Sequence, residues 1–121
     1  MMYRLPVQDV MSYDTQLVDQ FQREASTVMS EPWFTALSLD ARMAFLVIGL
    51  GQEAGEAQEV YKKAIPFQKE RDKEKIAEEL GDTLWHIATI AAMESISLAD
   101  IMRKSMQKFR KRYPHRFVEV S

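Results

Sequence analysis

The sequence predicts an all-α fold, a four-helix bundle formed by a single domain that spans residues 1–121. Three observations predict it. Glycine and proline are rare, with four of each, and residues that favour helices dominate. Apolar side chains recur at the spacing of one helix face. No stretch alternates polar and apolar residues for long enough to indicate a strand.

Four helices are expected, each bounded by a capping residue, a proline or both. With their caps they cover about residues 14–29, 38–64, 72–95 and 97–113. The second begins at Ser38 or Asp40 and ends ahead of Pro66, since the residue before a proline resists the helical conformation. Ser97 and Asp100 resemble a capping box at the start of the fourth.

Composition and charge limit the class of protein. A formal net charge of −2 gives no general attraction to nucleic acid polymers or membranes. Without cysteine, the chain has no disulfide framework and no thiolate metal site. Residues 1–10 lack the apolar core of a signal peptide, and the longest apolar run, residues 43–50, is too short to cross a bilayer. We therefore expect a cytoplasmic protein without a membrane or a nucleic acid polymer as partner.

Two short segments, residues 53–56 and 79–82, each carry two acids with the spacing i, i+3. The four acids are Glu53, Glu56, Glu79 and Asp82. Residues three apart lie on one face of a helix, and both pairs interrupt largely apolar stripes. We therefore expect all four carboxylates to point toward the interior, from two facing helices.

Buried carboxylates need a counter-charge, because an unpaired one costs several kcal/mol. Mg²⁺ commonly binds carboxylates together with substrate phosphates. Gly55 and Gly81 precede the second acid of each pair, and a glycine within a helix costs roughly 1 kcal/mol. They indicate that a helix or a phosphate approaches closely. The four acids are therefore predicted to bind Mg²⁺, or Mn²⁺, and to carry catalysis. The alternatives are a solvated acidic face and a di-iron site, which needs Glu-x-x-His motifs.

At these residues the sequence resembles the MazG-like nucleotide pyrophosphohydrolases, in the all-α NTP pyrophosphatase superfamily. That family carries an E-x-x-E motif on one helix and an E-x-x-D motif on the next. Two positions depart from its pattern. Gln52 stands where many members have a second glutamate, and Ser105 stands where many have an asparagine. The matching stretches are residues 49–56, 78–86 and 108–114, within a resemblance that covers about residues 40–117.

The resemblance implies Mg²⁺-dependent hydrolysis of a nucleoside triphosphate between the α and β phosphates, as in nucleotide-pool housecleaning. The products are the monophosphate and pyrophosphate. Water would attack directly, and one of the four acids, Glu59 or Glu78 would accept its proton. Apolar stripes on both sides of the long helices and the resemblance together predict a homodimer or homotetramer, with the tetramer preferred.

Further substrate contacts are predicted by residue type and by the resemblance. Residues 101–118 hold seven Lys or Arg and no acid, and cations suit phosphate binding. His86 shares a helix face with Asp82, so a hydrogen bond to that carboxylate is its other expected role. Lys73 or Lys75 could also face phosphate. The predicted substrate-binding residues are Lys108, Arg112, Lys63, His86 and Trp33.

Two rival functions remain. A phosphoribosyl-ATP pyrophosphohydrolase is one, since residues 82–86 are similar to that family's Asp-Leu-Leu-Tyr-His. The other is a non-catalytic helical oligomerisation or regulatory module, in which the acids would be surface groups and Mg²⁺ would leave the melting temperature unchanged.

Overall fold

A computed structural model of the chain describes residues 15–117, and it confirms the all-α prediction, with no strand among those residues. The four expected long helices are present, with one short helix in addition. They are α1 (Gln16–Ala25), α2 (Pro32–Thr35), α3 (Leu39–Ala64), α4 (Lys73–Met93) and α5 (Leu98–Arg112), with 3₁₀ turns at Ser26–Ser30, Ile65–Phe67 and Pro114–Arg116.

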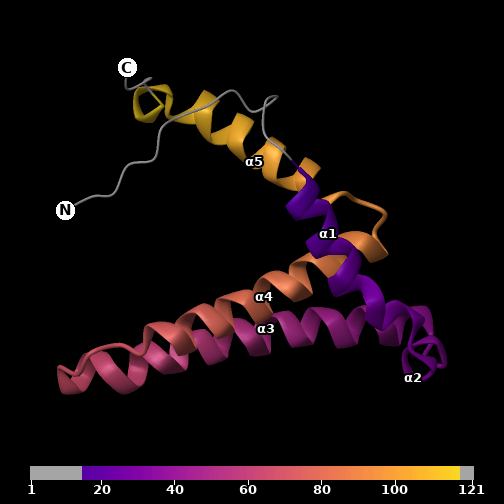
Figure 1. The fold of residues 1–121 in the computed structure, drawn as a ribbon, viewed down its shortest axis with the longest axis horizontal. Helices are drawn as coiled ribbons and strands as arrows, with labels where there is room; N and C mark the ends of the chain where they lie inside the picture. Colours follow the sequence, from indigo (N-terminus) through magenta and orange to yellow (C-terminus); the bar gives the residue numbers. More distant parts are fainter. Residues whose placement is uncertain (1–14, 118–121) are drawn as a thin grey trace.

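Helices α3 and α4 form a long antiparallel hairpin, and the remaining helices gather at one end of it (Figure 1). α1 packs against α4 at that end, and α5 packs against α1 and then diverges from the hairpin (Figure 1). The opposite end is closed by residues 65–72, which connect α3 to α4. We call this the closed end. None of the described helices is long and apolar enough to span a membrane.

Side-chain caps fix where three of the long helices begin. The side chains of Ser38, Asp72 and Ser97 accept hydrogen bonds from backbone N–H groups three residues further on, at 3.1, 3.1 and 3.4 Å. Such a bond satisfies one of the free N–H groups of a helix's first turn. Of the two residues expected to start the second helix, Ser38 is therefore the cap.

The first helix is shorter than predicted. It ends at Ala25 and continues only as the 3₁₀ turn, and its expected cap, Asp14, lies outside the described residues. The hydroxyls of Ser26 and Thr27 donate to the carbonyls of Gln22 and Glu24, at 2.6 and 2.7 Å. Ser and Thr side chains that bond to nearby carbonyls compete with regular helix, a local effect that apolar periodicity does not register.

A single amide ties the helices together at the corner. The side chain of Gln22 donates to the carbonyl of Ile96 and accepts from the backbone N–H of Leu98, both at 2.9 Å. It thereby joins α1 to the segment between α4 and α5. Around it lies a small core, in which Ala25, Ala88 and Leu98 are buried.

The hairpin itself is sparsely covered. Several large apolar side chains on α3 and α4 lie open to solvent, among them Ile48 (70% exposed), Leu80 (56%) and Leu84 (45%). A single chain therefore leaves much of the apolar surface of its two longest helices without a partner, which is unusual for a stable monomer.

The glycines act differently from expectation. A Cβ added at Gly55 or Gly81 would meet nothing within 4 Å, so no helix of the described residues approaches closely at these two positions, and the close approach of a phosphate there stays a prediction. The close approach between α3 and α4 lies instead at Gly49, more than one helix turn before Gly55 on α3. A Cβ at Gly49 would come within 2.7 Å of Nε2 of His86, so glycine at this position lets the imidazole of α4 lie against the backbone of α3.

Replacing Gly81 by alanine is therefore expected to stabilise the fold by about 0.5–1 kcal/mol, because alanine favours the helix and finds open space. Chemical denaturation of the metal-free protein measures this, with Gly55→Ala as a parallel case. Loss of stability in both variants would instead mean that another molecule occupies the space beside these glycines.

Candidate metal centre

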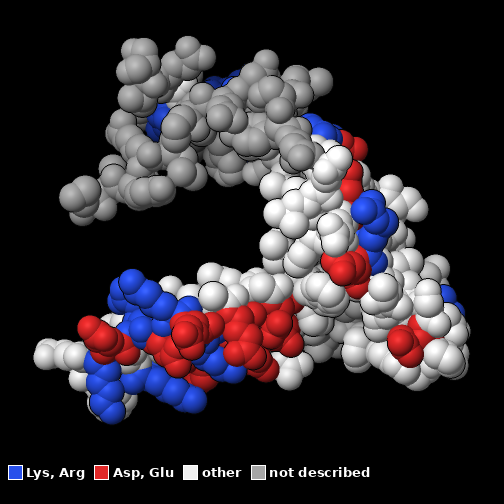
Figure 2. Space-filling model, viewed as in Figure 1, with Lys and Arg blue, Asp and Glu red and all other residues white. Residues whose placement is uncertain are grey.

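Facing turns of α3 and α4 bring the acids together. Ligand atoms of Glu53 and Glu56 on α3 and of Glu79 on α4 lie within 4.8 Å of one another. Glu79 also belongs to a second such group, with Glu78 and Asp82. All four predicted acids are thus joined in two overlapping groups that share Glu79. Figure 2 shows Asp and Glu side chains gathered over the middle of the hairpin, with Lys and Arg side chains among and beyond them toward the closed end.

Burial distinguishes the four acids. Glu79 is only 2% exposed, and Glu53 is half-buried. Glu56 and Asp82 are exposed. The prediction that every acid points inward is therefore correct for Glu79 and partly so for Glu53, and it is wrong for the other two. Their ends reach solvent because no other element covers this face of the hairpin.

Lys75 balances part of the buried charge. Its Nζ lies 2.9 Å from Oε1 of Glu79 and 3.7 Å from Oε2 of Glu78. The hydrogen bond to Lys75 lowers the pKa of Glu79, and the same bond raises the pKa of Lys75 above 10.5. Both groups therefore stay charged at neutral pH. Among the described residues, no other Lys or Arg forms a salt bridge with an acid of the cluster.

Glu56 behaves in the opposite way. Hydrogen bonding to Glu79 raises the pKa of Glu56 above its ordinary value of 4.5, and repulsion from the charges of Glu53 and Glu79 adds to the effect. One lysine is thus too little for this many carboxylates, and the cluster holds a proton more tightly than isolated glutamates would.

Two oxygens show what the cluster lacks. Oε2 of Glu53 and Oε2 of Glu79 are buried without a hydrogen-bond partner, and an unsatisfied buried acceptor costs about 1–3 kcal/mol, more when charged. Oxygens that bind one Mg²⁺ or Ca²⁺ ion lie at most about 4–5 Å apart, twice the metal–oxygen distance. The separations within the cluster are at most 4.8 Å, which meets that limit for Ca²⁺ and exceeds the limit for Mg²⁺ by no more than about 0.6 Å, and every donor is a hard oxygen. The residues therefore fit a divalent ion.

The opposed pKa shifts predict how pH acts on the metal-free protein. The pKa of Glu56 is raised, so its ionisation costs stability as pH rises above 4.5. The pKa of Glu79 is lowered, so the stability it contributes is present above 4.5 and is lost as pH falls through its folded value. The contribution of the cluster should be greatest near 4.5. Thermal unfolding in the presence of a chelator, repeated across this pH range, measures the contribution of the cluster to stability. Glu56→Gln should remove only the loss of stability that occurs as pH rises above 4.5. If that variant lost as much stability above 4.5 as the wild type does, the prediction would be contradicted.

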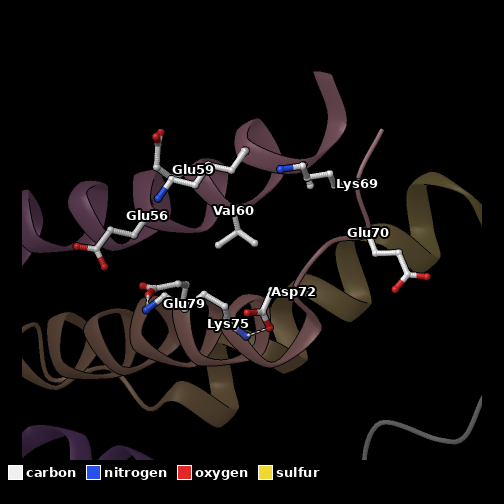
Figure 3. Close-up of a pocket in the computed structure, with 10 residues that line it drawn as sticks. Glu56, Glu59, Val60, Lys69, Glu70, Asp72, Lys75 and Glu79 are labelled. Atoms are coloured by element: carbon white, nitrogen blue, oxygen red, sulfur yellow. Dashed lines mark hydrogen bonds and ion pairs between the residues drawn. The ribbon is translucent and has the colours of Figure 1, made fainter. Parts of the chain in front are cut away.

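A cavity of about 530 Å³ adjoins the cluster, between α3 and α4. Glu56 and Glu79 line it toward the middle of the hairpin, and Lys69 lies toward the closed end (Figure 3). Three lysines belong to its lining. Lys63, predicted as a substrate contact, is one of them; the others are Lys69 and Lys75. Lys69 is the residue that the sequence interpretation missed, because it lies in the connection, where no helical period relates it to the acids. Lys75 stands four residues before Glu79, the spacing of a helical ion pair.

Lys108 and Arg112 lie elsewhere in this chain. Both are on α5, which diverges from the hairpin (Figure 1), and their charges lie 5.5 and 5.7 Å from the ring centre of Phe109. The fold of one chain therefore does not bring them to the carboxylates. Their role in phosphate binding stays a prediction.

His86 and Trp33 have well-defined surroundings. Nδ1 of His86 lies 3.0 Å from the backbone carbonyl of Asp82, so its partner is that carbonyl and not the carboxylate. Trp33 packs edge-on against Phe34 and Phe45, with ring centres 5.7 and 5.3 Å apart, and remains half exposed. Base contact by either residue stays a prediction.

Comparison with known proteins agrees with this arrangement. Residues 44–117 match the MazG nucleotide pyrophosphohydrolase domain. YvdC, an uncharacterised protein of Bacillus subtilis (strain 168), is 36% identical over 81 residues, which are 59% of this chain and 76% of the relative. No solved structure shows a significant match. The matched segment contains all four acids and the helices that present them, and the chain belongs to the MazG nucleotide pyrophosphohydrolase family.

Proposed function

We propose that the chain is a Mg²⁺-dependent pyrophosphohydrolase that cleaves nucleoside or deoxynucleoside triphosphates between the α and β phosphates. Glu53, Glu56, Glu79 and Asp82 would hold the metal. The observation that carries the proposal is the pair of buried carboxylate oxygens without a partner, in a cluster that one lysine balances only in part. Family membership supports the reaction class.

Each part of the site then has a chemical task. When bound, the metal supplies positive charge that offsets the phosphates and favours attack by water. Glu78 is the better placed of the two extra carboxylates to accept the proton of that water, because its oxygens lie within 4.8 Å of Glu79 and Asp82 ligand atoms. Glu59 points away from α4 (Figure 3).

A release assay tests the activity. Purified protein with Mg²⁺ or Mn²⁺ is expected to release pyrophosphate from at least one member of a panel of canonical and modified triphosphates that also includes phosphoribosyl-ATP. Release only from phosphoribosyl-ATP would mean that the chain is a phosphoribosyl-ATP pyrophosphohydrolase instead. No release from any member would contradict the proposed function and favour a non-catalytic module.

We further propose that the chain works as a homo-oligomer, a dimer or a tetramer. The exposed apolar side chains of α3 and α4 support this, because burying each large apolar side chain contributes about 1.5–3 kcal/mol. A second copy is the natural occupant, since obligate homo-oligomers bury surfaces as apolar as a protein core.

Light scattering is expected to give a mass of two or four times 14.1 kDa. Leu80→Asp is expected to lower it, because a charge in an apolar interface is costly. Lys62→Asp, on an exposed polar position of α3, is the matched control. A wild-type mass of 14.1 kDa would contradict the proposal.

A further inference from the structure

The cavity beside the carboxylate cluster has two chemically different ends. Carboxylates of Glu56 and Glu79 line it toward the middle of the hairpin, and Lys63, near the end of α3, and Lys69, in the connection, line it toward the closed end. The ammonium group of Lys75 lies with the carboxylates, 2.9 Å from Oε1 of Glu79. Figure 3 shows Lys69 extending toward the space between the two helices, above Asp72 and Lys75. Anion-binding and cation-binding groups therefore follow one another along the hairpin.

Helix geometry fixes the order of these groups. Lys63 follows Glu56 by seven residues, which is two turns on the same face and about 10 Å along the axis. Lys69 lies beyond it, in the connection. The lysine end is therefore a fixed distance from the acids, on the side away from α1 and α2.

The two outer lysines are free to meet an anion. Neither Lys63 nor Lys69 forms a salt bridge with any carboxylate of the described residues. Of the nearby acids, Glu59 and Glu70 point away from the cavity (Figure 3), and Asp72 accepts a hydrogen bond as the cap of α4. At the opposite end, Oε2 of the 2%-exposed Glu79 lacks a partner. Lys63 and Lys69 thus have no carboxylate as a partner, and the acid end has Lys75 as its one lysine counter-charge among the described residues.

We propose that the lysine end binds the two outer phosphates of the triphosphate, so that the pyrophosphate group points to the closed end of the hairpin. This rests on the proposed function. The water oxygen bonds to the α-phosphorus, and the bond from that phosphorus to the bridging oxygen breaks. The bridging oxygen leaves with the pyrophosphate, whose charge Lys63 and Lys69 offset, and the proton of the water passes to a carboxylate.

The proposal also gives the substrate a direction. With pyrophosphate at the closed end, the nucleoside lies toward α1 and α2. His86 lies on that side, one turn beyond Asp82 along α4. Trp33 contacts Phe45, which precedes Glu53 by eight residues, or about 12 Å along α3. The nucleoside would therefore lie on the same side as His86 and Trp33, two of the predicted substrate-binding residues.

Anion binding at this end should depend on metal. The cluster at one end of the cavity holds five carboxylates, and among the described residues only Lys75 forms salt bridges with any of them. The excess of negative charge opposes a phosphate group until a divalent cation offsets it. Pyrophosphate is therefore expected to bind with Mg²⁺ and to bind far more weakly with a chelator.

Calorimetric titration with inorganic pyrophosphate and, separately, with a nucleoside monophosphate tests the assignment. In the presence of Mg²⁺, Lys63→Ala and Lys69→Ala should each weaken pyrophosphate binding about tenfold, as expected for loss of a charge-assisted hydrogen bond. Binding of the monophosphate and of Mg²⁺ should be unchanged. Both lysines are exposed, so the variants should fold as the wild type does.

Lys62→Ala is the matched control, since Lys62 neighbours Lys63 on α3 but does not line the cavity. Wild-type pyrophosphate affinity in both test variants would overturn the proposal, as would an equal loss in the control or a loss of monophosphate binding. If only Lys108→Ala weakened pyrophosphate binding, the proposal would be overturned in favour of a phosphate site on α5.

Activity separates this proposal from the one on which it rests. If the wild type hydrolyses triphosphates and the lysine variants keep its KM and its inhibition by pyrophosphate, only the lysine assignment fails. If the wild type hydrolyses none, the proposed function fails, and metal-dependent binding of pyrophosphate still reports on the lysines.

Discussion

Glu79→Gln is expected to lower pyrophosphate release by at least about 10²–10³-fold, the size of effect seen when one strong electrostatic contact to a transition state is removed. Glu79 is the one acid shared by both groups of potential metal ligands, and it is the most buried. The amide keeps the shape and removes the charge. Mg²⁺ should then no longer raise the melting temperature, because binding that favours the folded state is lost.

The matched control is Glu59→Gln, which removes one charge from a residue that lines the same cavity but points away from α4 (Figure 3). It should keep both activity and the response to Mg²⁺. If Glu79→Gln retained the thermal response to Mg²⁺, the assignment of the metal ligands would be wrong, whatever happened to activity.

Gly49→Ala is expected to lower the free energy of unfolding by up to about 2 kcal/mol. The new Cβ would lie 2.7 Å from Nε2 and 2.9 Å from Cδ2 of His86. The ring cannot turn away without losing its 3.0 Å contact with the carbonyl of Asp82. Overpacking of this kind costs about 1–3 kcal/mol, and alanine's better helix propensity returns about 1. Chemical denaturation measures the difference.

A double-mutant cycle isolates the cause. In a His86→Ala background the obstructing ring is absent, so the same Gly49→Ala change should stabilise the helix by about 1 kcal/mol. A reversal of sign identifies the imidazole as the obstacle. Gly51 is the matched control, because a Cβ there would meet nothing within 4 Å. Equal losses at Gly49 and Gly51 would contradict this explanation.

Much of the fold could be predicted because it depends on local patterns. The caps at Ser38, Asp72 and Ser97 act within one turn, and so they can be read from the sequence. The end of α1 could not be predicted in this way, because the hydroxyls of Ser26 and Thr27 donate hydrogen bonds to carbonyls near the end of that helix. The short helix α2 was missed because a proline that ends one helix also favours the first turn of another.

The site shows the same division. Spacing and position within apolar stripes identified the four acids and predicted that they lie on facing helices, and the structure brings them into two overlapping groups. Spacing could not predict their unequal burial, since that depends on which face of the hairpin the other helices cover. Lys69 could not be predicted either, because only the path of the connection places it beside the cavity. For the glycines, the close approach of the two helices lies at Gly49 and not at Gly55 or Gly81, where the approach of a phosphate stays a prediction.

The amide of Gln22 holds the start of α5, so a small rotation there would move the far end of that helix by a larger distance. The amide bonds to the backbone of Ala88 on α4, of Ile96 in the turn and of Leu98 on α5. α5 has 15 residues, which makes an arm of about 22 Å. A rotation of about 10° at the corner would swing the far end of that arm by about 4 Å. The position of its basic tip is thus set by a neutral side chain at its root, and the hairpin that carries the acids need not move.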